Sequence, residues 1–198
     1  MQDCYETDRE KPIIVKRVFI AIKVEAGETL LKVMSAFMTG LENESIKWIN
    51  KQNVHLTLAF LGDTEEEKIV ALDSLLKEKC EGFGNFQMLI KGSGVFKNLN
   101  DPRVIWAGIE VSEKLVLLNN LILRGLPEIG IQIENRAFRP HLTLGRIRHL
   151  SSGNTLKDLI DRYNALIIQK VQVTEVILFE STLLRTGPVY TVISKYSL

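Results

Sequence analysis

Hydrophobic and polar positions alternate with two different periods along this chain. Runs of β-branched and aromatic residues, typical of strands, are separated by segments whose apolar residues recur every three or four positions, as on one face of a helix. The clearest helical stripe consists of Leu30, Val33, Met34, Phe37, Met38 and Leu41. The pattern predicts strands at 17–24, 54–61, 86–96, 103–111, 140–147, 171–181 and 189–196, and helices at 28–41, 113–126 and 155–163.

One more helix is predicted before the strand at 86–96. Thr64 and Glu67 have the spacing of a capping box, and the helix would end at Gly82. Its apolar face would consist of Ile69, Leu72, Leu76 and Cys80. Glycines inside the strand at 86–96 predict a bulge or bend, and the segment NLNDP at 98–102 predicts a turn.

The order of elements repeats at a constant spacing. The motif HLTL occurs twice, and His141 and Thr143 lie 86 residues after His55 and Thr57. The same interval separates the Arg-Val pairs that open the first and fourth strands. A fixed interval shared by separate motifs predicts two similar lobes related by a pseudo-twofold axis. We therefore expect an α+β, bilobal fold in which two mainly antiparallel sheets face a central cleft and the helices lie outside.

The repeat also defines the expected domain organisation. Residues 1–16 are charged and aperiodic, and we interpret them as an N-terminal extension. Residues 17–198 would form a single bilobal domain. Within it, the repeats would run from about 17 to 98 and from about 103 to 184, followed by the final strand at 189–196.

Composition narrows the class of protein. The net charge is +1, so no global field attracts nucleic acid or a membrane, and a polyanion must meet a local basic patch. Cys4 and Cys80 fit neither a disulfide framework nor a structural zinc site, and we interpret both as free thiols in a reducing compartment. No segment resembles a signal peptide or a membrane span. We therefore expect a cytoplasmic protein that does not contact membranes. The sequence leaves the oligomeric state open, and because nothing in it indicates an obligate partner, we expect a monomer.

The two HLTL segments are the strongest functional signal. On a strand, His55 and Thr57 share one face and the two leucines share the other, and the same holds for His141 and Thr143. An isolated strand histidine is usually a surface residue or a hydrogen-bonded core residue. Two of three histidines each standing two places before a threonine is, however, about a 1% coincidence. If the lobes face each other, two imidazoles and two hydroxyls converge.

Several other chemistries fit these residues poorly. A zinc site needs three or four ligands, whereas each of these histidines is followed by a hydroxyl, so we expect no metal and no cofactor. No GxSxG segment supports a serine nucleophile. Two imidazoles with pKa values near 6.5 instead make an acid–base pair suited to in-line attack on a phosphodiester. Thr57 and Thr143 would then hydrogen-bond the non-bridging phosphate oxygens.

The second motif lies in a basic segment. Residues 136–149, RAFRPHLTLGRIRH, contain four arginines and no acidic residue. Arg139 and Arg146 are the candidates for phosphate contacts, because a guanidinium matches phosphate oxygens in geometry. Arg139 falls on the strand face of His141, whereas Arg146 falls on the opposite face unless the strand ends or bulges after Gly145.

These residues resemble the two-histidine (2H) phosphoesterase superfamily, which is defined by two H-x-[ST]-x motifs in a bilobal fold. More narrowly, the chain from about Arg17 onward is similar to the RNA 2′,3′-cyclic phosphodiesterase branch, also called LigT-like 2′–5′ RNA ligases. The segments that carry the resemblance are RVFIAIKV, NVHLTLAFLGDT, RVIWAGIE, FRPHLTLGRIR and LFES…GPVYTV. The resemblance implies metal-independent hydrolysis of RNA 2′,3′-cyclic phosphates to 2′-phosphomonoesters, with reversible 2′–5′ ligation as a further activity.

The resemblance also implies a role for each matching residue. His55 would be the general acid that protonates the departing 3′ oxygen, and His141 the general base that activates water. These two roles would be exchanged in the ligation direction, and the sequence alone does not fix them. Thr57 and Thr143 would bind phosphate oxygens, and Arg146 would add positive charge.

Substrate contacts beyond the phosphate are less defined by the sequence. Phe60 and Trp48 are candidate base-stacking surfaces, although such residues more often pack within a fold. The expected partners are RNA 3′ ends that carry a 2′,3′-cyclic phosphate, tRNA fragments among them. Two alternatives stay open: an RNA-end binding module without turnover, and a phosphodiesterase for small nucleotides such as ADP-ribose cyclic phosphate.

Overall fold

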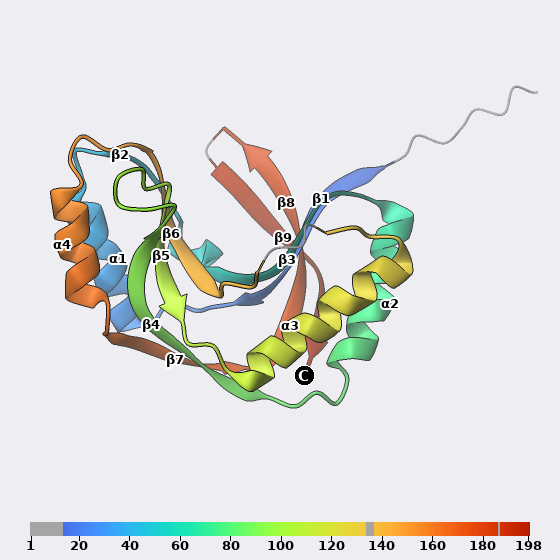
Figure 1. Ribbon diagram of the computed structural model, residues 1–198. Coiled ribbons are helices and arrows are strands. Elements are labelled where there is room, and N and C mark those ends of the chain that lie inside the picture. The colour runs from blue at the N-terminus through green and yellow to red at the C-terminus, as the bar shows by residue number, and fades with distance from the viewer. Residues whose placement is uncertain (1–13, 134–136, 186) are drawn as a thin grey trace, which may run out of the picture.

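The computed structural model describes residues 14–133, 137–185 and 187–198 (Figure 1). The strands are β1 (Val15–Lys23), β2 (Ser45–Trp48), β3 (His55–Glu65), β4 (Phe86–Phe96), β5 (Val104–Ile109), β6 (His141–His149), β7 (Ile167–Val173), β8 (Glu175–Leu184) and β9 (Gly187–Ser197). The α-helices are α1 (Glu28–Gly40), α2 (Glu66–Cys80), α3 (Glu113–Gly125) and α4 (Asn154–Tyr163), with 3-10 helices at Lys51–Asn53 and Leu126–Ile129.

The described strands form one curled, antiparallel sheet. Its order is β7-β4-β5-β6-β3-β1-β8-β9, and β2 pairs with β6. The predicted α+β class and the antiparallel pairing are confirmed. The two expected sheets are continuous with each other, because β3 and β6 pair at Leu56 and Leu142. The two HLTL strands therefore lie side by side at the junction between the lobes.

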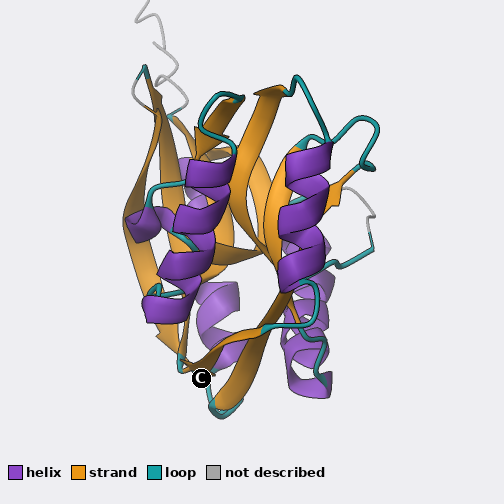
Figure 2. Ribbon diagram, turned by 90° about the vertical axis from the view of Figure 1, so that its left-hand side faces the viewer, coloured by secondary structure: helices purple, strands orange, loops and turns teal. Residues whose placement is uncertain are grey.

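Each half of the repeat contributes its last strand to the other lobe. β4 ends the first half and pairs with β5, whereas β8 ends the second half and pairs with β1. The helices are grouped in the same crossed way: α1 packs with α4 near β4 and β7, and α2 packs with α3 near β8 and β9. Figures 1 and 2 show both helix pairs on the outer side of the curled sheet, as expected.

Burial on the helices follows the predicted apolar stripes. The buried residues of α1 are Leu30, Val33, Met34 and Phe37, and those of α2 include Ile69, Leu72, Leu76 and Cys80. Met38 is the exception, because its side chain is 43% exposed. The stripe predicted for α1 is therefore one residue too wide, and Met38 lies at the solvent edge of the helix.

The predicted capping box is wrong. Thr64 lies within β3, where its hydroxyl donates to the carbonyl oxygen of Gly62 at 3.1 Å. The helix begins at Glu66, with Glu65 as the N-cap residue and no side-chain cap. The physical reason is that β3 stays paired with β1 as far as Glu65, so the strand uses residues that the pattern had given to the helix start.

Two further elements differ from the pattern. β2 was not predicted, because four residues are too few to establish a period. The strand predicted at 171–181 is in fact two strands, β7 and β8, which are separated at Thr174. β7 pairs with β4 and β8 pairs with β1, so they lie in different lobes. Both strands bury apolar residues, which is why the hydrophobic pattern continues through the break.

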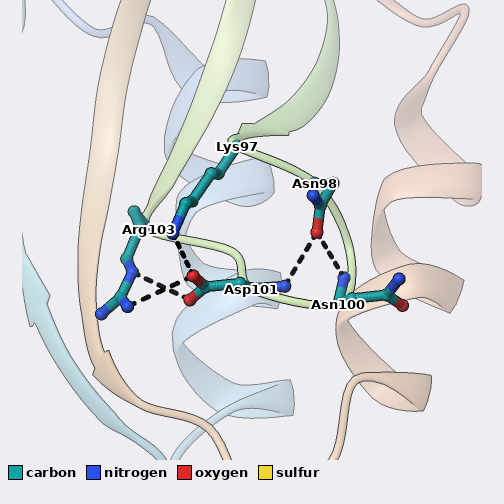
Figure 3. Close-up of polar contacts among 5 residues, drawn as sticks. All are labelled: Lys97, Asn98, Asn100, Asp101 and Arg103. Carbon is teal, nitrogen blue, oxygen red and sulfur yellow. Dashed lines mark hydrogen bonds and ion pairs between the residues drawn. The ribbon is translucent and has the colours of Figure 1, made fainter.

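A polar turn closes the hairpin between β4 and β5, as Figure 3 shows. The side-chain oxygen of Asn98 accepts hydrogen bonds from the backbone N–H groups of Asn100 at 3.0 Å and Asp101 at 2.9 Å. The Asp101 carboxylate pairs with Lys97 and, at 2.9 Å, with Nε of Arg103. The predicted turn is confirmed, and it fixes the end of the hairpin.

Three other expectations concern the chain as a whole. Cys80 is a buried free thiol, and burial raises its pKa to about 11. Cys4 and residues 1–13 lie outside the described residues, and β1 already begins at Val15. No helix in the described part of the chain is both long and apolar enough to cross a membrane. The division into an N-terminal extension and one bilobal domain stays a prediction.

Candidate active site

A small cavity lies where β3 and β6 meet, with a volume of about 110 Å³. It is lined by His55 and Thr57 from β3 and by His141, Thr143 and Arg146 from β6. The other lining residues are Phe19, Ile49, Asn53, Phe60, Ser181 and Tyr190. The sequence places each histidine on the same strand face as its threonine, and the fold brings both pairs into one cavity.

A β-bulge turns Arg146 toward this cavity. The pairing of β6 with β5 skips Leu144, so one extra residue is inserted into β6. Leu144 and the next residue, Gly145, are both buried, and Arg146 therefore returns to the face of His141 and Thr143. Strand alternation alone had left Arg146 on the opposite face, and the bulge resolves this conflict.

The other lobe contains the same irregularity. The pairing of β3 with β1 skips Leu58, and Leu58 and Ala59 are both buried. Phe60 consequently lies on the cavity side of β3, where its side chain is 53% exposed. Phe60 and Arg146 are 86 residues apart in the sequence, so the bulge obeys the repeat. Each lobe thus adds a third side chain to its motif pair, an aromatic ring from β3 and a guanidinium from β6.

Both histidine rings are held by a backbone carbonyl two residues earlier in the chain. Nδ1 of His55 lies 2.7 Å from the carbonyl oxygen of Asn53, and Nδ1 of His141 lies 2.7 Å from that of Arg139. A carbonyl oxygen only accepts hydrogen bonds, so Nδ1 carries a proton in both rings. In the neutral form Nε2 therefore holds the lone pair, and Nε2 is the atom that exchanges protons with a ligand.

Aromatic side chains pack against both imidazoles. The ring centroids of Phe19 and Tyr190 lie 5.0 Å and 5.3 Å from that of His55. The Phe96 ring meets His141 edge-on, with centroids 4.6 Å apart. Together with the Nδ1 hydrogen bonds, these contacts limit the rotation of both rings and hold them in one orientation.

The protein lowers the pKa of both histidines below 6.5. Burial is the main cause for His55 and for His141, and the positive charge of Arg146 acts in the same direction. The hydrogen bonds to the carbonyl oxygens oppose this effect, and a proton on His141 further lowers the pKa of His55. Without a ligand, both rings are therefore mostly neutral at pH 7. A bound phosphate anion favours the protonated form and would raise both pKa values.

The family model described as LigT like Phosphoesterase matches residues 20–106 and 109–190, and each matched segment contains one HLTL motif. The chain belongs to this LigT-like phosphoesterase family. The resemblance that its sequence motifs carry is therefore confirmed, over both halves of the chain.

Similar proteins and structures support this membership. The RNA 2′,3′-cyclic phosphodiesterase of Thermotoga maritima is 34% identical to this LigT-like phosphoesterase over 179 residues, which cover 89% of this chain and 92% of that protein. The protein of the same name from Methanocaldococcus jannaschii is 32% identical over 183 residues, covering 91% and 99%. The crystal structure of E. coli LigT complexed with 3′-AMP matches with a TM-score of 0.73 and 25% identity, covering 93% and 99%.

Two residues that were expected to contact substrate do not line the cavity of this LigT-like phosphoesterase. Arg139 is exposed and lines two neighbouring cavities, both of which share His141 with the first. Trp48 packs against the hydrophobic core and is paired with Gly145 on the neighbouring strand β6. A Cβ added at Gly145 would lie 2.8 Å from the Trp48 indole. Trp48 thus supports β6 beside the bulge, whereas Phe60, the other candidate for base stacking, does line the cavity.

Several lining residues were not singled out from the sequence. Asn53 stands two places before the first motif, and its side-chain amide donates to the carbonyl oxygen of Pro188 at 3.2 Å, which joins the β8–β9 hairpin to the motif strand. Tyr190 lies within the segment GPVYTV, which carried the resemblance, and burial raises its pKa. Ser181 on β8 is buried at the same wall. These residues enter the site through tertiary pairing, which no local period reveals.

The chemistry of the cavity comes from its side-chain donors and acceptors. Among the described residues, no group of three or more histidine, cysteine or acidic side chains is placed to hold a metal ion. The cavity instead combines two imidazoles, two threonine hydroxyls and one guanidinium. This set can bind an anionic group and can move protons on opposite sides of it.

Proposed function

We propose that this LigT-like phosphoesterase hydrolyses RNA 2′,3′-cyclic phosphate ends to 2′-phosphomonoesters, by two-histidine acid–base catalysis and without a metal ion. The observation that carries the proposal is the single cavity lined by His55, Thr57, His141 and Thr143. Relatives named RNA 2′,3′-cyclic phosphodiesterase, with 32–36% identity over most of the chain, support it.

The proposed reaction is an in-line displacement at phosphorus. Nε2 of His141 takes a proton from water, and the water oxygen forms a bond to phosphorus. The bond from phosphorus to the 3′ oxygen breaks, and Nε2–H of His55 gives its proton to that oxygen. The products are a 3′-hydroxyl and a 2′-phosphomonoester, and both histidines end in the opposite protonation state.

The remaining cavity groups stabilise the charge on phosphate. Thr57 and Thr143 stand at the same strand positions relative to the two histidines, so their hydroxyls can donate to the two non-bridging oxygens. The guanidinium of Arg146 adds a positive charge on the same face. Phe60 offers an exposed ring at the rim, with Cζ of Arg17 4.8 Å from its centroid on one face. We propose that a base of the RNA chain stacks on the other face.

The finer parts of the proposal concern the reverse ligation reaction, the RNA substrates, the oligomeric state and the cellular location. In the ligation direction an RNA 5′-hydroxyl takes the place of water, and the histidine roles are exchanged. E. coli LigT has been crystallised with 3′-AMP, which supports nucleotide 3′ ends as ligands for this chain. We further propose that tRNA fragments are among the substrates and that the protein acts as a cytoplasmic monomer.

The test is incubation of the protein with a short RNA that ends in a 2′,3′-cyclic phosphate. We expect loss of the cyclic phosphate, with the phosphoryl group retained only on the 2′ oxygen. A product with a 3′-phosphate would contradict the assignment of the leaving oxygen. Comparison with a mononucleotide 2′,3′-cyclic phosphate and with ADP-ribose cyclic phosphate identifies which substrate class is preferred.

The rival function is an RNA-end binding module without turnover. Both motifs are intact and share one cavity, which favours an enzyme. Tight binding of the cyclic-phosphate RNA, with no product after long incubation, would establish the rival and overturn the proposal.

A further inference from the structure

Trp106 lies flat against the sheet on a floor made by two glycines. A Cβ at Gly94, on the neighbouring strand β4, would lie 2.3 Å from Cζ2 of the indole, and a Cβ at Gly108 would lie 3.3 Å from Cζ3. Neither glycine adopts a left-handed backbone conformation. The close approach of the indole therefore explains the missing side chain at Gly94, whereas at Gly108 the carbonyl oxygen of Lys91, 2.6 Å from an added Cβ, is closer still.

Phe96 extends this surface toward the site. Its ring lies 5.8 Å from the indole of Trp106 and 4.6 Å from the imidazole of His141, measured between centroids. Phe96 and Trp106 line a largely apolar cavity of about 450 Å³, and His141 lines both this cavity and the small one between the motif strands. We call these two aromatic residues the Trp106–Phe96 platform. The platform lies directly beside His141, the proposed general base.

The buried N–H group of the Trp106 indole destabilises the fold, because it lost its hydrogen bond to water on burial. The Nε1–H of Trp106 is buried without a hydrogen-bond partner among the described residues. A phenylalanine at this position would have no donor to leave unpaired, but it would lack the outer indole ring that lies over Gly94 and Gly108. A large flat ring suits a ligand that stacks, and base–aromatic stacking tolerates any base because every base has a π face.

We infer that the Trp106–Phe96 platform binds the nucleobase of the nucleotide that carries the cyclic phosphate. This inference rests on the proposed function. In a 2′,3′-cyclic phosphate, the base is carried on C1′, next to the 2′ carbon whose oxygen keeps phosphorus. The rest of the RNA leaves from C4′, next to the carbon of the departing 3′ oxygen. If His55 faces that oxygen, the chain runs out on the His55 and Phe60 side and the base lies toward His141.

The rim of this cavity is charged. Arg139 lines it and is exposed, and Lys91 and Glu110 form an ion pair of 3.6 Å at the same wall. These groups can meet the polar edge of a base while the platform contacts its face. Arg139 lies outside the phosphate cavity, but in this mode of binding it lies beside the nucleobase.

Fluorescence gives a direct test, because the chain has only two tryptophans, Trp48 and Trp106. The Trp48→Phe variant reports on Trp106 alone, and the Trp106→Phe variant is its matched control. Titration with adenosine 2′-monophosphate, the expected product, should quench the emission of Trp48→Phe, whereas inorganic phosphate should not. The emission of Trp106→Phe should change little. Equal responses to both ligands in Trp48→Phe, or none to the nucleotide at saturation, would overturn the inference.

Kinetics separate this inference from the proposed function. For adenosine 2′,3′-cyclic phosphate, Trp106→Leu should raise KM roughly 5- to 150-fold, the range expected for one stacked base, with a much smaller change in kcat. Trp106→Phe should lie between Trp106→Leu and the unmodified protein. An unchanged KM in an active Trp106→Leu variant would refute the platform and leave the proposed function standing. Absence of any hydrolysis by the unmodified protein would refute the function, and if Trp106→Leu fails to fold, the fluorescence titration still decides.

Discussion

Phe60 and Arg146 occupy equivalent positions in the two lobes but differ completely in chemistry. Each lies two residues after a buried leucine that the strand pairing skips, and each lines the phosphate-sized cavity. The backbone repeat therefore makes two equal places beside the histidines. The sequence fills one with an apolar ring and the other with a guanidinium, so among the residues that line the cavity the permanent cation comes from β6.

Arg146→Ala should lower kcat/KM about 10- to 100-fold, the loss expected for one charged hydrogen bond to phosphate. Arg146→Lys should recover only part of the rate, because a single ammonium does not match two phosphate oxygens. Phe60→Ala is the matched variant at the equivalent position, and its effect should fall on KM, since it removes a contact to base and not to phosphate. Steady-state kinetics on a cyclic-phosphate RNA measures all three. A larger kcat effect at Phe60 than at Arg146 would refute this division of roles.

The pH optimum of kcat/KM should lie on the acidic side of neutrality. The mechanism needs one protonated and one neutral imidazole, and burial places the pKa of both His55 and His141 below 6.5 in the free protein. Above both pKa values, the singly protonated fraction falls about tenfold per pH unit. We therefore expect kcat/KM to decline as pH rises through 7 and 8. The kcat profile should decline at higher pH than kcat/KM, because bound phosphate raises both pKa values. A kcat/KM that rises from pH 6 to 8 would contradict the account.

The same pKa shifts predict acid-sensitive stability. Unfolding returns His55 to a pKa near 6.5, so below that pH the unfolded chain binds a proton that the folded chain resists. The free energy of unfolding should thus be unaffected by His55 above about pH 6.5. It should decrease as pH falls from there toward the pKa of His55 in the folded protein. His55→Gln should weaken this decrease, which denaturant titrations at pH 5 and pH 7.5 would measure. An identical pH dependence in both proteins would show that the folded pKa of His55 is not lowered.

Chelation should leave the reaction unchanged. The proposed steps use only imidazole, hydroxyl and guanidinium groups, and none requires a Lewis acid. We expect the same kcat with and without excess chelator, after dialysis against it. Loss of activity that added metal restores would overturn the metal-free mechanism.

The sequence predicted the parts of the site that repeat and missed those that depend on pairing. The constant interval between the two HLTL motifs was enough to expect His55, Thr57, His141 and Thr143 in one place. The position of Arg146 was ambiguous, because strand alternation holds only until a bulge inserts a residue, and a bulge is set by the neighbouring strand. Trp106 was not singled out, although it lies within the segment RVIWAGIE that carried part of the resemblance. Its significance comes from Gly94, which is adjacent only across the β4–β5 hairpin.

The fold, like the site, was predicted where the sequence pattern is local and was missed where it depends on strand pairing. Helices with a clear apolar stripe were placed almost to the residue, since their pattern is local. The four residues of β2 and the break at Thr174 were missed because they are defined by partners in the sheet rather than by a period of their own. The sheet closed into one continuous surface at Leu56 and Leu142, a contact that no one-dimensional pattern specifies.

The central claim is that both imidazoles act on one phosphorus in the same step, and a mutant cycle tests it most directly. Turnover of a cyclic-phosphate RNA should be measured for His55→Ala, His141→Ala and the double variant. His149→Ala is the control, because His149 is exposed and lies outside the cavity. Each single change should lower kcat about 10²–10⁴-fold, and the double variant should be scarcely slower than the worse single one, since groups that act as a unit are not additive. Full activity in either single variant, with its fold intact, would contradict the account.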